Sequence, residues 1–139
     1  MSDDLYPEAI LRLAQSARGA GRLDPPGLSA TTDSPICGDR ATVEVRAEGG
    51  KVRALAHAVR GCVLCRAAAA ALAEVAEGTA TAEIAALPGR IAAMLKGESQ
   101  APSGRFAAFA VFAPVGPHRS RHGCVLLPLR AAAQALDKA

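Results

Sequence analysis

The stretch TVEVRAEGGKVRALAHAV, residues 42–59, decides the fold. In residues 42–47, polar and apolar side chains alternate, which is typical of a strand with one buried face. The sequence Glu48-Gly49-Gly50-Lys51 then supplies the glycines that a tight hairpin turn needs. Residues 52–59 are apolar enough to form the returning strand. We therefore predict an antiparallel hairpin near the centre of the chain.

Helix-forming sequence surrounds this hairpin. Apolar residues recur at helical spacing in residues 4–17, and a loop rich in Gly and Pro follows over 19–27. After the hairpin, the Ala-rich residues 66–77 favour a helix that ends at Gly78. We expect four further helices, over residues 81–87, 90–96, 106–112 and 127–136.

Prolines set the expected limits of these later helices. Pro88-Gly89 should separate the first two, Pro114 should follow the third, and Pro128 fits the first turn of the last. The order of elements predicts an α+β fold in which several helices pack on one face of a small antiparallel sheet of about three strands. We see no internal boundary, so we expect a single domain over residues 1–139.

The composition argues against several classes of protein. The chain has 139 residues, no Trp and 3% aromatic residues, so a base-stacking surface is not expected. The net charge of +3 is small and the Arg residues are dispersed, which argues against nucleic acid as a partner. Neither a signal peptide nor an apolar run of about 20 residues is recognisable. We therefore expect a soluble, cytoplasmic protein with no membrane partner.

The four cysteines are the main candidates for chemistry. In a reducing compartment they favour metal or thiol chemistry over structural disulfides. Cys37, Cys62 and Cys124 each lie at the end of a predicted element. The hairpin should bring the approach to its first strand beside the exit from its second, so Cys37 and Cys62 are expected neighbours. Gly38 should let the chain turn so that Cys37 and Asp39 face one centre.

Three thiolates and one carboxylate suit a metal ion. This set satisfies the four-coordinate preference of zinc. It also suits iron, with the oxygen ligand leaving more readily than the sulfur ligands. Cys62, Cys65 and Cys124 lie near predicted helix starts, where the helix dipole favours the thiolate. Two alternatives remain open: each Cys can be a small buried apolar residue, or Cys62 and Cys65 can form a redox pair, although no βαβ context supports one.

Three short motifs follow one another in a fixed order along the chain. They are Cys37-Gly38-Asp39-Arg40, then Arg60-Gly61-Cys62 before Ala67–Ala71, then Arg121–Cys124 before Leu127. In this order they resemble the three boxes of the NifU N-terminal, IscU and SufU family of iron–sulfur cluster assembly scaffolds. The opening segment, residues 5–23, is also similar to that family. The resemblance therefore covers nearly the whole chain.

The resemblance implies a carrier of iron–sulfur clusters and favours a non-enzymatic scaffold over an enzyme. Such a scaffold binds iron and a [2Fe–2S] cluster, or zinc when the cluster is lacking, and here the ligands would be Cys37, Asp39, Cys62 and Cys124. Its implied partners are a cysteine desulfurase and apo iron–sulfur acceptor proteins, and it would be a monomer or weak dimer. In that family the aspartate is associated with the lability of the cluster.

The long segment between Cys62 and Cys124 keeps a second function open. It resembles the SufU branch, whose members accept sulfur from a cysteine desulfurase in a zinc-dependent way. In that interpretation Cys124 would be a sulfur acceptor. A third interpretation is a domain that zinc merely stabilises, with no transfer role.

The sequence also departs from the family pattern. Gly123 stands where IscU-type members carry His, and we interpret the neighbouring His122 as a bystander. Cys65 stands where many members have a small residue, and it is either a spare sulfur acceptor, an alternative metal ligand or a packed residue. We predict that metal binding does not need it. His57 should be a half-buried structural residue, and His118 should face solvent.

Overall fold

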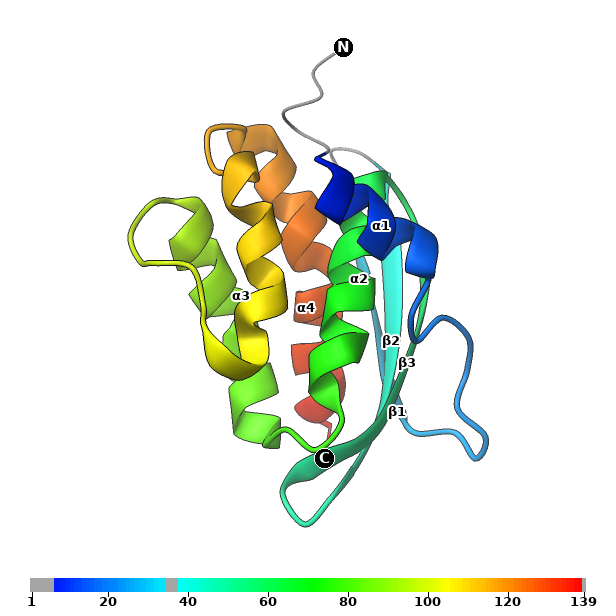
Figure 1. Cartoon of the computed structure of the whole chain (residues 1–139). Helices are drawn as coiled ribbons and strands as arrows, with labels where there is room; N and C mark the ends of the chain where they lie inside the picture. Colours follow the sequence, from blue (N-terminus) through cyan, green and yellow to red (C-terminus); the bar gives the residue numbers. More distant parts are fainter. Residues whose placement is uncertain (1–6, 35–37, 139) are drawn as a thin grey trace.

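The computed structural model describes residues 7–34 and 38–138. The elements in chain order are α1 (Glu8–Ser16), β1 (Leu28–Asp33), β2 (Arg40–Glu48), β3 (Lys51–Arg60), α2 (Val63–Ala76), α3 (Thr81–Leu95), η1 (Gly104–Val115), η2 (Arg119–Arg121) and α4 (His122–Leu136). The helices gather on one side of a three-stranded antiparallel sheet (Figure 1). This confirms the predicted α+β architecture. None of the helices within the described ranges is long and apolar enough to cross a membrane.

The central hairpin forms as predicted. β2 and β3 pair antiparallel, and Glu48 opposite Lys51 closes the turn. Gly49 and Gly50 both have positive φ, +62° and +76°, which is what a two-residue turn that follows the twist of its strands requires. β1, which sequence analysis did not locate, pairs with the other side of β2 and gives the strand order β1-β2-β3.

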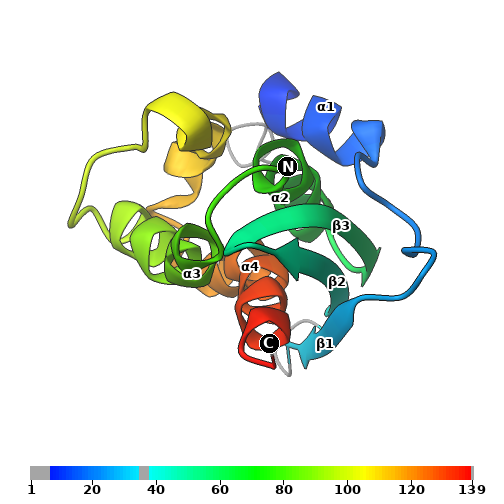
Figure 2. The same cartoon turned by 90° about the horizontal axis from the view of Figure 1, so that it is seen from below.

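The core lies between one face of the sheet and the helices α2 and α4. Val43 and Val45 of β2 are fully buried on this face. The five alanines 67–71 of α2 are also fully buried, and their small side chains allow α2 to pack closely on all sides. α1 covers α2 and α3 covers α4, so two further helices shield this layer (Figures 1 and 2).

The opposite face of the sheet carries the segment that joins α1 to β1. The carboxylate of Glu44 on β2 accepts hydrogen bonds from the N–H groups of Leu23, at 3.0 Å, and Gly27, at 2.9 Å. These bonds hold the pKa of Glu44 below its usual value, since they favour the charged form. Gly21 and His57 are also joined by backbone hydrogen bonding at the free edge of β3. The loop is therefore fixed on the sheet.

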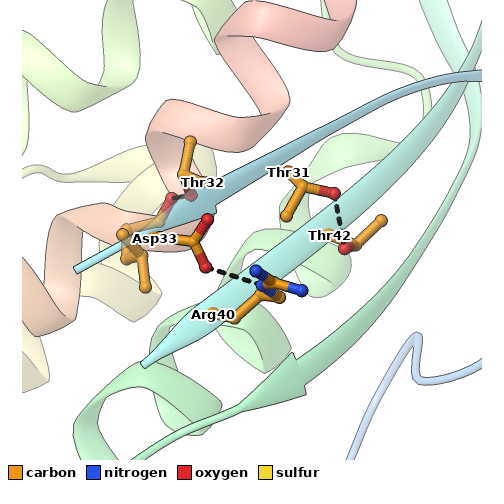
Figure 3. A network of polar contacts seen from close by, with 6 residues as sticks. Thr31, Thr32, Asp33, Arg40 and Thr42 are labelled. Atoms are coloured by element: carbon orange, nitrogen blue, oxygen red, sulfur yellow. Dashed lines mark hydrogen bonds and ion pairs between the residues drawn. The ribbon is translucent and has the colours of Figure 1, made fainter. Parts of the chain in front are cut away.

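Polar side chains fix β1 to its neighbours (Figure 3). The buried hydroxyl of Thr32 donates a hydrogen bond of 2.9 Å to the carbonyl of Leu127 in α4. The Thr31 and Thr42 hydroxyls pair across β1 and β2 at 2.8 Å, and Arg40 contacts the Asp33 carboxylate at 2.6 Å. These contacts hold β1, β2 and α4 together at the end of the sheet where β2 begins.

The prediction of two helices over residues 81–87 and 90–96 is wrong, because α3 runs without a break from Thr81 to Leu95. Pro88 and Gly89 lie inside it. Its buried apolar side chains keep helical spacing across the proline: Ile84, Leu87, Ile91, Met94 and Leu95. Burial of this continuous stripe outweighs the local cost of Pro and Gly, as tertiary packing often overrides intrinsic propensity.

The segment predicted as a helix ending before Pro114 is a 3-10 helix that includes Pro114 and ends at Val115. Its four buried side chains recur at every third position: Phe106, Phe109, Phe112 and Val115. That period matches the three residues per turn of a 3-10 helix, which lines up positions i and i+3. The fixed φ of proline also suits this conformation.

The closing helix begins earlier than predicted. α4 starts at His122, so Pro128 is its seventh residue and does not lie in its first turn. Buried Cys124, Val125 and Leu126 extend the apolar pattern toward the N-terminus, and their burial holds this turn in the helix. Cys124 therefore lies inside the first turn of α4, whereas the sequence placed it just before the helix.

Candidate metal centre

Three segments far apart in the sequence meet at one end of the sheet. Asp39 immediately precedes β2, and Cys62 follows β3 as the N-cap residue of α2. The pairing of Arg40 with Arg60 brings the start of β2 beside the end of β3. α4 packs against both α2 and β2, and its first turn contributes Cys124. The N-termini of α2 and α4 lie at the same end of the molecule (Figure 1).

The ligand atoms of these three residues form one compact group. A carboxylate oxygen of Asp39 and the sulfurs of Cys62 and Cys124 all lie within 4.8 Å of one another. Two thiolates on opposite sides of a zinc ion would be separated by at most about 4.6 Å, which is twice a zinc–sulfur bond. Small side-chain adjustments are therefore sufficient for all three to contact one ion.

The Asp39 carboxylate is held in a closely fitted position. It is 6% exposed, and its Oδ2 accepts a hydrogen bond of 3.3 Å from the Cys62 backbone N–H. An ideal Cβ placed on Gly61 would lie only 2.7 Å from the Asp39 Cγ, so only Gly at position 61 allows this approach. Sequence analysis did not predict this role of Gly61. The available signal was the position of this glycine, directly before the candidate ligand Cys62.

The turn before Asp39 depends on Gly38. This residue has a φ of +72°, which side-chain-bearing residues rarely adopt. Its N–H donates to the Ser34 carbonyl at 2.9 Å, and the Ser34 N–H donates to the Asp39 carbonyl at 2.9 Å. The positive φ of Gly38 fits the predicted turn. Cys37 lies outside the described residues, so its expected place beside Cys62 stays a prediction.

The Cys62 thiol is acidified by its neighbours. Its pKa falls to about 7, mainly because the Cys124 side chain hydrogen-bonds to the Cys62 sulfur, with a smaller contribution from the Cys65 backbone N–H. Partial burial and the Asp39 carboxylate act in the opposite direction. On balance these contacts favour the Cys62 thiolate near neutral pH.

The remaining predicted residues lie around this centre. Cys65 is fully buried beside Ala41 and Leu127, and it is not a member of the three-residue ligand group found among the described residues. His122 is also outside that group, and its Nε2 lies 2.8 Å from the Gly116 carbonyl oxygen. Its interpretation as a bystander agrees with this contact.

The two other histidines are not members of the ligand group found among the described residues. His57 is 5% exposed and so more buried than predicted, and Gly19 lies against its ring, since a Cβ there would be 3.3 Å from the His57 Cδ2. Its Nε2 lies 2.6 Å from the Arg18 carbonyl oxygen, and burial lowers its pKa. The structural role predicted for His57 fits these contacts. His118, predicted to face solvent, is half-buried.

The chain matches the family model described as the NifU-like N terminal domain over residues 5–125. The chain belongs to this family. A crystal structure of an N-terminal NifU-like protein from Brucella abortus is 34% identical and superposes with a TM-score of 0.92, covering 98% of this chain and 94% of that one.

Two further proteins are similar to this member of the NifU-like N terminal domain family. The iron–sulfur cluster assembly scaffold protein IscU of Thermotoga maritima is 28% identical over 134 residues, which is 96% of this chain and 94% of the relative. A putative SUF-system scaffold, SufU, from Fervidobacterium islandicum has a TM-score of 0.89 at 20% identity, covering 98% of this chain and 99% of that one. The likeness to SufU shows the shared fold alone.

Proposed function

We propose that this protein is an iron–sulfur cluster assembly scaffold. It would bind iron and a [2Fe–2S] cluster through Cys37, Asp39, Cys62 and Cys124, and pass the cluster to apo acceptor proteins. The observation that carries this proposal is the convergence of the Asp39, Cys62 and Cys124 ligand atoms within 4.8 Å. The family relationship to an IscU scaffold supports the same function.

The chemistry of the ligands suits a cargo that must be bound and later released. Thiolates are strong ligands for iron, and the N-termini of α2 and α4 favour their negative charge. The carboxylate oxygen of Asp39 is the harder and more readily exchanged ligand. Cys37 would complete the set, and the support for this is that Gly38 and Asp39, which follow it in the sequence, are held by hydrogen bonds to Ser34. The same four groups suit zinc when no cluster is bound.

The partners follow from this chemistry. Sulfide has to come from a sulfur donor, for which we propose a cysteine desulfurase, and the cluster has to leave to an apo iron–sulfur protein. We propose that residues 1–139 act as one domain in both exchanges, as a monomer or weak dimer.

A SufU-like sulfur acceptor is the second candidate, and the acidity of Cys62 favours it. A thiolate near neutral pH is the form that attacks the persulfide of a donor enzyme. Cys124, the acceptor expected from the sequence, is 1% exposed, whereas Cys62 is half-buried. We therefore propose Cys62 as the first acceptor and Cys124 as the alternative.

Cluster transfer from the Asp39→Ala protein tests the scaffold proposal. Loss of the exchangeable oxygen ligand should make the reconstituted cluster longer-lived and slow its transfer to an apo-ferredoxin several-fold. The matched control is Asp137→Ala, which removes an exposed carboxylate at the C-terminal end of α4. Faster loss of the cluster from Asp39→Ala than from the control contradicts the proposed role of the carboxylate.

Persulfide mapping separates the two candidates. After incubation with a desulfurase and cysteine, trypsin releases Cys62 in residues 61–66 and Cys124 in residues 122–130. If the protein is a sulfur acceptor, incubation of its zinc-bound form without iron should leave the added sulfur on one of these peptides. A scaffold without acceptor function carries none under those conditions and still assembles a cluster from iron and sulfide.

A further inference from the structure

Cys62 and Cys65 form a second chemical unit at the start of α2. Cys62 is the N-cap residue, and Cys65 is the third residue of the helix. Positions three apart in a helical turn are neighbours, with Cβ atoms separated by roughly 5–6 Å. A disulfide requires a Cβ separation of about 3.5–4.5 Å. The backbone of Cys62 is not helical, with φ −71° and ψ 173°, so a change of its ψ can bring the two residues closer within this one turn.

The surroundings of the two thiols differ in a way that suits stepwise exchange. Cys62 is half-buried and so remains partly open to a reagent from solvent. Cys65 is fully buried in a small cluster with Ala41 and Leu127, and Cys62 packs against this cluster. A more accessible thiol that reacts first, followed by a buried neighbour that reacts second, suits stepwise Cys-x-x-Cys exchange, because the rate depends on access to the attacking thiol.

We propose that Cys62 and Cys65 are a reversible dithiol–disulfide pair whose substrates are disulfides of the glutathione type. The Cys62 thiolate attacks the disulfide R–S–S–R, forming a mixed disulfide Cys62–S–S–R and releasing one thiolate RS⁻. The Cys65 thiolate then attacks the Cys62 sulfur, forming the Cys62–Cys65 bond and releasing the second RS⁻. The two protons lost by the cysteines convert both thiolates to RSH. The pair is oxidised by two electrons and R–S–S–R is reduced by two.

This activity has a consequence for the metal centre. A sulfur held in the Cys62–Cys65 bond is no longer a thiolate, so oxidation removes one ligand from the group formed with Asp39 and Cys124. This loss of a ligand rests on the proposed metal site. The thiol–disulfide exchange does not depend on a metal, so it can be tested on metal-free protein.

The test is titration of the full chain, with chelator present, in a graded series of glutathione disulfide to glutathione. Samples are quenched in acid, alkylated without reduction and digested with trypsin. Residues 61–66 contain Cys62 and Cys65 alone, whereas Cys37 falls in residues 23–40 and Cys124 in residues 122–130. We expect the 61–66 peptide to lose both alkylation sites together and to become two hydrogens lighter.

Cys65→Ser gives the decisive comparison. Without the second thiol, the mixed disulfide of Cys62 with glutathione should rise from a minor species to the main oxidised product. In Cys124→Ser the 61–66 disulfide should still form. Three results overturn the proposal: a peptide 61–66 that stays doubly alkylated, a wild-type protein that accumulates the mixed disulfide, or a crosslink of 61–66 to 122–130. None of them bears on whether the reduced protein assembles a cluster.

Discussion

At the scale of single residues, Gly61 controls how closely Asp39 approaches the start of α2. In Gly61→Ala the new Cβ would lie 2.7 Å from the Asp39 Cγ and 2.9 Å from its Oδ2, so the carboxylate must move. We expect a loss of about 1–3 kcal/mol in the free energy of unfolding, as for other overpacked sites. We also expect weaker zinc binding, measured by competition with a chromogenic chelator.

Gly123→Ala is the matched control for this prediction. Gly123 lies next to Cys124 in α4, and a Cβ there meets nothing within 4 Å. This variant should be as stable as the wild type, or more stable by up to about 1 kcal/mol, because Ala is the better helix former. If the Gly61→Ala and Gly123→Ala proteins bind zinc equally well, Gly61 is not needed to position Asp39 and the prediction is wrong.

A second residue-scale prediction concerns the acidity of Cys62. The folded-state pKa of about 7 lies below the ordinary cysteine value, so the thiolate fraction rises with pH and is half-maximal near pH 7. The rate at which iodoacetamide alkylates Cys62 in metal-free protein should follow this curve. Cys124→Ala should move the midpoint upward, since the main stabilising contact is lost, and Asp39→Asn should move it downward. A midpoint near 8.5, the value of an unperturbed thiol, in all three proteins contradicts the proposed contacts.

At the scale of elements, the continuity of α3 gives a direct test. Gly89 lies in the interior of this helix with helical backbone angles, is exposed, and has open space where a Cβ would lie. Gly89→Ala should therefore raise the free energy of unfolding in urea by about 0.5–1 kcal/mol. Gly97→Ala is the contrasting control, because Gly97 has a φ of +78° and Ala there should destabilise by about 1 kcal/mol. Destabilisation by Gly89→Ala would instead indicate a break between two helices.

The same elements show what local sequence can and cannot reveal. The hairpin and the alanine-rich body of α2 were predictable, because the alternation of residues 42–47, the paired glycines and the alanine run act locally. The start of α2 was not, since the helix begins at Val63 and the prediction began it at residue 66. The limits of α3, η1 and α4 were not, since Pro88, Pro114 and Pro128 are tolerated where tertiary burial outweighs their cost. The spacing of three between buried Phe residues in η1 was a signal that could have been used.

At the scale of the whole molecule, the order and packing of the strands and helices bring the three ligands of the candidate metal centre together. Hairpin pairing alone brings Asp39 beside Cys62, which is why a prediction from the sequence was within reach. The contribution of Cys124 depends on how α4 packs across α2 and β2, and a single sequence carries no local signal for that packing. The fit of Gly61 to Asp39 likewise appears only when the two strands are placed in register.

Anaerobic reconstitution with iron, sulfide and reductant tests the central claim most directly. After desalting, the wild-type protein should show visible sulfide-to-iron charge-transfer bands and bound iron. Cys62→Ala and Cys124→Ala should lose most of both, because each removes a converging thiolate, while Cys65→Ser should keep them. A colourless wild-type protein, or full cluster content in the Cys62→Ala and Cys124→Ala proteins, would contradict a cluster site built on Asp39, Cys62 and Cys124.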